Sequence, residues 1–458
     1  MRTRSSKKRK GLPAGIEPYD WALKQLRIAQ AHKVTRGSRE IVVAVIDLGY
    51  NDHPDHRGHL WVNPRPKGGA KHGWDCHDND ASLEDNFYDP PTAYSKGHHA
   101  FVVGEVIACA PRCPVMIVRV GYGNNESWAD GIDWAVQHGA KVLVIPHGYL
   151  PPTGTDGPLK FERGLDFVYP SENLRLRHAI EAAHDAGCLI VRGTADNRGR
   201  RVSFPFAALD SVMAVGSTNR RDEPADICAD ADYVAVGAPG GERHSGDPRD
   251  LVWGTGGDRD YISFSGGCMA AGFGGGVAAL VWSQFPGLAN EQLRQVLRNT
   301  ARGDGWGSRL GHGILDAGKA CRLKEEQLSQ RLDIKRGSFR RVSRKRLRVT
   351  VINRGAFDVK QAMVVVYNAD PRKTPLRSPA ELVTCQIGHA MAPVCGLGEQ
   401  SLEISLSLET NCPGVFVNAA PLPSVSDPIW LELYVLDHGA SSGAKVLKLS
   451  AATGTPPA

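Results

Sequence analysis

Apolar residues in the first two thirds of the chain form continuous runs that alternate with segments of helical spacing. Ile41–Ile46 contains no polar residue, which is typical of a central parallel strand covered on both faces. Trp128–His138 and Leu174–Ala186 have the spacing of helices. Further strand-like runs lie at 115–120, 141–145, 188–191, 212–216 and 233–236. Strands that alternate with helices predict an α/β domain with a parallel sheet, extending to about Arg322.

The pattern changes beyond this point. Short alternating or apolar runs follow, separated by turn residues and without convincing helices: 347–352, 363–367, 402–408, 415–417, 429–436 and 446–449. Six or seven short strands in about 110 residues predict a β-sandwich. Ahead of the first strand, Asp20 to about Val34 has helical spacing and predicts a helix.

The charge is concentrated in two short runs. The chain has 458 residues and a formal net charge of +6. Residues 1–10 hold six basic side chains and no acidic one, and 331–348 hold nine basic side chains and one acidic, so the remainder carries −8. A mildly acidic folded part argues against nucleic acid as the main partner. We therefore expect a basic tail (1–15), an α/β domain (16–325), a basic linker (326–348) and a β-sandwich (349–452).

Composition excludes several classes of protein. Hydrophobic residues make up 41% and charged residues 23%, as in a globular protein with a sizeable core. No apolar run reaches the length of a membrane span, and no apolar stretch follows the basic N-terminus as in a secretory signal. With ten cysteines and no signal, we expect reduced thiols and a cytoplasmic location. Cys109 and Cys113 have CxxxC spacing, but no second pair supports a zinc site.

Four residues of the α/β region lie where such folds place their chemistry. Asp47 ends the first strand, His98 heads an apolar helical segment, Asn197 follows a buried strand, and Cys268 precedes a helix of small residues. Each alone has an ordinary interpretation: a turn residue, a surface histidine, a strand-end amide and a buried small side chain. Together they supply an acid, a base, an amide donor and a nucleophile, in that order along one domain.

This order and its surroundings resemble the subtilisin-like (subtilase, S8) peptidase family over about residues 20–320. Supporting segments are His53-Pro54-Asp55, Ala129–Val136, Val212–Ser217 and Gly311–Ala317. The resemblance implies a peptidase acting on a protein or peptide substrate. It assigns Asp47 to orient the imidazole, His98 to act as general base and then acid, Cys268 to attack the scissile carbonyl, and Asn197 to donate to the oxyanion. His98 is preferred to His99 because it lies six residues before Gly104, as in the family.

The chain also departs from the family pattern. The family has serine in a Gly-Thr-Ser-Met-Ala-x-Pro segment, whereas this chain has Gly267-Cys268-Met269-Ala270 with neither the threonine nor the proline. The glycine that precedes the oxyanion asparagine is replaced by Asp196. The surroundings of the site therefore differ more from the family than the four residues themselves.

Three interpretations of Cys268 stay open at this point. It is a working nucleophile held as a thiolate by His98 and a helix N-terminus, hydrolysing peptides or transferring the acyl group to an amine. Alternatively, the larger sulfur atom is misplaced in a serine-shaped site, and the chain is an inactive pseudo-protease that binds proteins as a scaffold. The third interpretation is an introduced Ser→Cys change, against which the altered neighbours argue.

Other calls concern cofactors and accessory parts. No cofactor is required by this chemistry. Acidic residues before the histidine, Asp75, Asp78 and Asp80 among them, suggest a structural calcium site, since subtilases often bind calcium, or else a solvated acidic loop. The short segment before the first strand suggests a form that folds without a pro-domain. The C-terminal segment weakly resembles CARDB-type or fibronectin-like sandwiches, which suggests a partner-protein site or a stabilising appendage.

Overall fold

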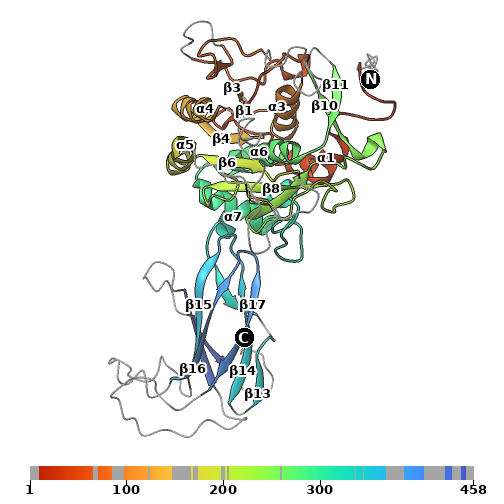
Figure 1. The fold of residues 1–458 in the computed structure, drawn as a ribbon. Helices are drawn as coiled ribbons and strands as arrows, with labels where there is room; N and C mark the ends of the chain where they lie inside the picture. The colour runs from red at the N-terminus through yellow and green to blue at the C-terminus, as the bar shows by residue number, and fades with distance from the viewer. Residues whose placement is uncertain are drawn as a thin grey trace. The chain divides into compact units, whose positions relative to one another are not determined.

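The computed structural model divides the chain into two compact units, residues 1–322 and 323–458 (Figure 1). The residues that it describes are 10–64, 66, 71–84, 97–121, 124–146, 167–168, 174–196, 202–203, 206–257, 260–335, 337–343, 345–367, 386–406, 429–435 and 445–449. No helix among these is long and apolar enough to cross a membrane.

A seven-stranded sheet forms the centre of the first unit, and all of its strand pairs are parallel. In spatial order the strands are β2 (Gly73–Asp75), β3 (Val115–Arg119), β1 (Val42–Asp47), β4 (Ala140–Ile145), β6 (Leu189–Gly193), β8 (Val212–Thr218) and β9 (Val234–Pro239). Their residues are almost all buried, as expected for a parallel sheet covered on both faces. The predicted α/β fold is confirmed.

Helices cover both faces of this sheet (Figure 1). One face carries α3 (His98–Cys109) and α6 (Gly267–Gln284), and the other carries α4 (Asn125–Gln137) and α5 (Leu174–Asp185). Glycines allow α6 to lie very close to the strands: a Cβ atom at Gly275 would lie 2.2 Å from a methyl carbon of Val144. The small-residue segment that follows Cys268 is therefore the surface by which α6 packs on the sheet.

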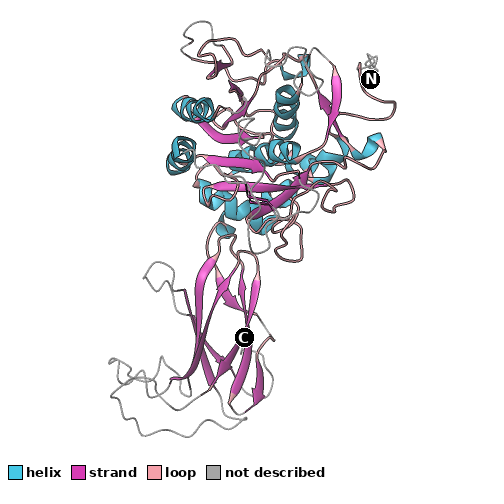
Figure 2. Ribbon diagram, viewed as in Figure 1, coloured by secondary structure: helices cyan, strands magenta, loops and turns pink. Residues whose placement is uncertain are grey.

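The remaining elements of the first unit surround this core (Figure 2). They are α1 (Asp20–Gln25), α2 (Ile28–Ala31), η1 (Pro54–His56), β5 (Phe167–Val168), β7 (Val202–Ser203), η2 (Pro248–Asp250), β10 (Val252–Thr255), β11 (Tyr261–Phe264), α7 (Asn290–Thr300) and α8 (Ala317–Ala320). The helix predicted over 20–34 is wrong as a single helix, because Arg27 has a left-handed φ of 57° between α1 and α2. The break is stabilised by an ion pair from Arg27 Nη1 to the buried Asp316 at 2.8 Å.

The second unit is all β in its described parts apart from η3 (Glu325–Gln327), as predicted. One antiparallel sheet contains β12 (Leu332–Ile334), β13 (Arg340–Ser343), β14 (Arg346–Asn353) and β17 (Glu399–Ser405). The other contains β15 (Val359–Tyr367), β16 (Gln386–Val394), β18 (Ile429–Val435) and β19 (Lys445–Leu449). Residues of both sheets, such as Val349 and Val364, belong to one buried cluster. β12 and β13 lie within the segment predicted as a linker, because Ile334 and Phe339 join this core.

Candidate active site

Asp47 and His98 form a buried pair at the carboxyl ends of the parallel strands. Asp47 is the last residue of β1 and His98 the first of α3. His98 Nδ1 lies 2.7 Å from Asp47 Oδ2, and the other carboxylate oxygen accepts the Leu48 N–H at 2.8 Å. Both side chains are at least 95% buried. The carboxylate is therefore fixed at both oxygens and holds the imidazole in one orientation.

Cys268 lies beside this pair and interacts electrostatically with His98. It is the second residue of α6, is half-buried, and is not in a disulfide. A helix N-terminus favours negative charge, so its place on α6 suits a thiolate. The structure thus brings together an acid, an imidazole and a thiol from three separate elements.

The electrostatics of the pair favour a charged imidazole. Burial would lower the pKa of His98, but the charge of Asp47, the hydrogen bond with Asp47 and the interaction with Cys268 outweigh burial and raise this pKa to about 10. The neighbouring His99 behaves differently: burial lowers its pKa to about 4, and its Nε2 lies 3.1 Å from the Val45 carbonyl oxygen. His98 is therefore the histidine that faces Asp47 and Cys268, and His99 is part of the protein interior.

An aromatic side chain fixes the other side of the imidazole. The rings of His98 and Phe264 meet edge to face, with their centroids 5.5 Å apart. Phe264 ends β11, only four residues before Cys268, and it also packs on Phe101 of α3 at 5.1 Å. The hairpin of β10 and β11 thereby links the position of the histidine to that of the nucleophile.

The predicted oxyanion donor, Asn197, lies outside the described residues. Its neighbour Asp196 is described: Oδ1 accepts the Gly267 N–H at 2.8 Å, and Oδ2 accepts from Arg243 at 2.7 Å. The acid that replaces the family glycine therefore contacts the residue immediately before Cys268.

Protein groups bind the carboxylates of Asp75, Asp78 and Asp80, the residues named for a calcium site. Arg119 donates to the carboxylates of both Asp75 and Asp78, and the second oxygen of Asp75 accepts two backbone N–H groups. Asp80 Oδ1 accepts from Ser82 N–H at 2.7 Å. No group of three metal-binding side chains occurs among the described residues. The proximity in sequence therefore reflects an arginine-centred ion-pair cluster.

Two residues beside the site were not singled out from the sequence. Arg243 comes from a polar loop after β9, and nothing in the surrounding sequence distinguishes it from a surface arginine. Glu105 is fully buried in α3 and interacts electrostatically with Cys268. It had a detectable signal, because it is the only charged residue within the otherwise apolar run of that helix.

Comparisons with known proteins agree with this geometry. The family profile described as the subtilase family matches residues 38–313. The thermostable alkaline protease of Halalkalibacterium halodurans is 30% identical over 66% of this chain and 73% of its own length. Subtilisin Savinase of Lederbergia lenta and thermitase of Thermoactinomyces vulgaris are each 26% identical over 66% of this chain and 98% of their own lengths.

Solved structures share the fold at lower sequence identity. A lanthipeptide protease is 22% identical with a TM-score of 0.53, covering 68% of this chain and 98% of its own. The MycP3 protease of a type VII secretion system is 20% identical with a TM-score of 0.51, covering 69% of this chain and 92% of its own. The profile match, the 30% identical relative and the arrangement of Asp47 and His98 lead to one conclusion: the chain belongs to the subtilase family.

Proposed function

We propose that this subtilase is a peptidase that uses Cys268 as its nucleophile. The observation that carries the proposal is the 2.7 Å contact between Asp47 and His98, with Cys268 interacting electrostatically with the same imidazole. A scaffold that only binds proteins has no physical need for a buried carboxylate aimed at a buried imidazole. The geometry provides what a thiol nucleophile requires, namely a partner for its proton and a helix N-terminus for its charge.

The proposed reaction begins from a thiolate–imidazolium pair, in which the proton of the Cys268 thiol already resides on His98. The thiolate attacks the carbonyl carbon of the scissile peptide bond, and the carbonyl oxygen becomes an oxyanion. The Cys268 N–H and the side-chain amide of Asn197 are the proposed donors to this oxyanion. Asp47 stabilises the imidazolium throughout.

Collapse of the tetrahedral intermediate breaks the C–N bond. His98 gives its proton to the leaving amine nitrogen, and the acyl group stays on sulfur as a thioester. His98 then takes a proton from water, which attacks the thioester carbon and releases the carboxylic acid and the thiol. An amine in place of water would give a new peptide bond by the same steps. Because the nucleophile must stay reduced, we propose a cytoplasmic location for the working enzyme.

A second candidate is an inactive, protein-binding subtilase. The observation that favours it is Asp196, which stands at a position where the family has glycine. Its carboxylate contacts Gly267, the residue directly before the nucleophile. A negative charge at this place opposes the formation of an oxyanion nearby. The same fold would then bind a polypeptide in its cleft without cleaving it.

Labelling with a thiol-reactive peptide probe separates the two candidates. The folded protein is treated with a peptidyl chloromethyl ketone, and the label is mapped by peptide mass spectrometry. The catalytic interpretation expects label on Cys268 that disappears in Cys268→Ala and falls strongly in His98→Ala. Cys113, which is buried, is the internal control and should stay unlabelled. An unlabelled Cys268 in folded protein, with other cysteines labelled, contradicts the proposal.

Substitution of the nucleophile gives an independent test. Cys268→Ser restores the family's serine, and general peptidase substrates then report whether the remaining machinery is competent. Cleavage by the parent protein that is lost in Cys268→Ala supports the proposal. Absence of cleavage in both the parent and Cys268→Ser supports the scaffold.

A further inference from the structure

One arginine joins the two segments that flank the nucleophile. Arg243 Nη2 donates to Asp196 Oδ2 at 2.7 Å and to the Ser265 carbonyl oxygen at 2.5 Å, and its Nε lies 3.1 Å from Ser265 Oγ. Asp196 follows the end of β6, and Ser265 lies between β11 and α6. The guanidinium therefore connects the strand that leads to Asn197 with the turn that leads to Cys268.

Asp196 carries this connection into the first turn of α6. Its Oδ1 accepts the Gly267 N–H at 2.8 Å, while its Oδ2 is held by Arg243. Gly266 leaves room for the pair, because a Cβ atom there would lie 2.8 Å from Asp196 Oδ2 and 3.4 Å from Arg243 Nη2. The absence of a side chain at position 266 is thus sterically compatible with the carboxylate at position 196.

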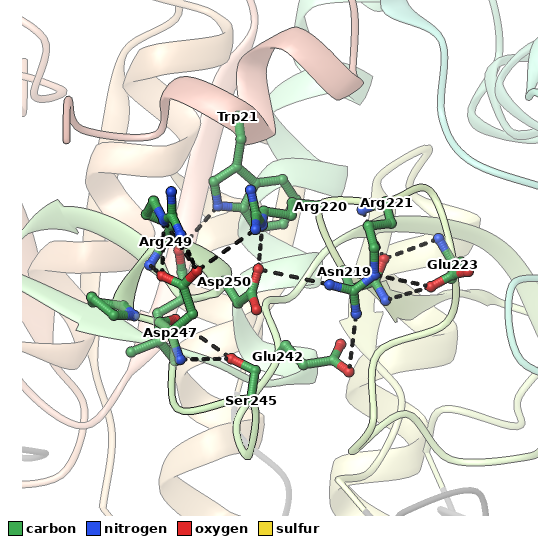
Figure 3. A network of polar contacts seen from close by, with 12 residues as sticks. Trp21, Asn219, Arg220, Arg221, Glu223, Glu242, Ser245, Asp247, Arg249 and Asp250 are labelled. Atoms are coloured by element: carbon green, nitrogen blue, oxygen red, sulfur yellow. Dashed lines mark hydrogen bonds and ion pairs between the residues drawn. The ribbon is translucent and has the colours of Figure 1, made fainter. Parts of the chain in front are cut away.

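The loop that presents Arg243 is itself firmly held. The backbone N–H groups of Arg243 and His244 each donate to the Asp226 carboxylate at 3.0 Å. The preceding residue, Glu242, belongs to the polar network of Figure 3, where its carboxylate lies 3.6 Å from Arg221 and its N–H donates to the Asp250 carbonyl at 2.8 Å. The guanidinium is therefore in place before any substrate binds.

The charges around Asp196 explain why it needs a cation. Among the described residues, the titratable groups that face its carboxylate are Arg243, His98 and Cys228. Burial raises the pKa of Asp196, and Arg243, the Gly267 N–H and the charge of His98 oppose that rise. Without Arg243, the Asp196 carboxylate would compete with the Cys268 thiolate for the positive charge of the His98 imidazolium.

We propose that Arg243 is a positioning residue for the chemistry of Cys268. It orients Asp196 onto the Gly267 N–H and offsets the charge of that carboxylate where the thiolate forms. In the reaction, Arg243 would likewise offset the Asp196 charge where the oxyanion forms, and this second role rests on the proposed peptidase function. Asp196 and Arg243 thus act as a pair that replaces the family's glycine without leaving a net charge at the site.

Alkylation of Cys268 by iodoacetamide across pH tests the proposal in the full-length protein. Arg243→Gln should lower the alkylation rate at pH 7 about tenfold, because the unpaired Asp196 carboxylate then opposes the negative charge of the thiolate. Arg243→Lys keeps the charge and should recover most of the rate. Asp196→Asn placed in the Arg243→Gln background should also recover it, because no negative charge remains to be offset. Arg249→Gln, an exposed arginine on the same loop that is paired with Asp247, is the matched control and should change nothing.

Two outcomes would overturn the proposal. One is an unchanged alkylation profile in folded Arg243→Gln protein, and the other is failure of Asp196→Asn to rescue it, since a merely structural arginine would not be rescued by neutralising its partner. Peptide hydrolysis is measured in parallel, and kcat should fall with KM unchanged. The protein could also show the expected dependence of alkylation on Arg243 and yet cleave no peptide. That result would contradict the proposed peptidase function but not the proposed role of the Arg243–Asp196 pair.

Discussion

The carboxyl group of Glu105 lies directly against Gly272, so that a Cβ atom on this glycine would be 2.0 Å from Glu105 Oε2. Gly272 occupies the position at which the family pattern has proline. Glu105 is fully buried, and neither of its oxygens has a hydrogen-bond partner within the described residues. Burial, with a smaller contribution from the charge of Cys268, raises the pKa of Glu105 well above its ordinary value. Burial therefore favours the neutral form of this carboxyl group, which lies against the helix one turn beyond the nucleophile.

Glu105→Gln should make the folded protein more stable at neutral and alkaline pH. The pKa of Glu105 is higher in the folded state than in the unfolded state. Above about pH 4.5 the folded state therefore keeps the Glu105 proton that the unfolded state has lost. The stability of the parent protein therefore falls between that pH and the raised pKa, and an uncharged amide of the same shape removes this loss. Urea unfolding at pH 5 and pH 8 measures it. An equal pH dependence in both proteins would contradict a neutral Glu105.

Gly272→Ala should destabilise the fold, and shortening Glu105 should relieve the effect. An added methyl group at 272 collides with the carboxylate, and overpacking of this kind costs about 1–3 kcal/mol. In a Glu105→Ala background, Gly272→Ala should lower the free energy of unfolding much less. A double-mutant cycle should therefore give a coupling energy that offsets part of the loss caused by Gly272→Ala alone. Gly287→Ala is the control, because nothing lies within 4 Å of a Cβ there. Additive losses would mean that the two residues are not in contact.

Much of the first unit was predictable because its strands are continuous apolar runs. Val42–Asp47 and Val115–Arg119 each lie where the pattern predicts a buried strand, and parallel strands bring their carboxyl ends to one edge of the sheet. Asp47 and His98 meet at that edge although 51 residues separate them. Strand ends, chain order and the resemblance to subtilases together anticipated this pair.

The surroundings of the site were not predictable for a physical reason. The role of Asp196 depends on Arg243, which lies 47 residues later in a loop whose course is fixed by other ion pairs. The pairing of Asp75 and Asp78 with Arg119, which comes from a buried strand, was likewise not visible in the sequence. Local sequence shows which charges are present, but the partner of each charge depends on tertiary packing.

Arg119→Gln should destabilise the first unit by about 3 kcal/mol, because it leaves the fully buried Asp75 carboxylate without its cation. The side chain of Arg119 is only 2% exposed and pairs with both Asp75 and Asp78. Arg57→Gln is the comparison variant, since its pair with Asp52 is solvent-exposed and such pairs contribute about 0–1 kcal/mol. Chemical unfolding of the two variants at the same pH measures the difference. Equal stabilities would show that Arg119 is not needed to compensate Asp75.

Asp47→Asn should abolish the reactivity of Cys268 at neutral pH while leaving the fold intact. Asp47 is what raises the pKa of His98 to about 10 against the effect of burial, so the amide variant loses the imidazolium that accompanies the thiolate.

Because the pKa of His98 is raised in the folded state, the Asp47–His98 pair contributes stability that is complete below about pH 6.5 and disappears as pH rises through about 10. The variant should therefore be less stable than the parent at pH 6, and the two should converge above pH 10. The rate of peptide cleavage should fall by about four orders of magnitude, as when the corresponding acid of a serine triad is neutralised. Denaturation across pH and alkylation of Cys268 at pH 7 test the two effects separately. A parent-like alkylation rate in the variant would show that the thiol does not depend on Asp47 and His98.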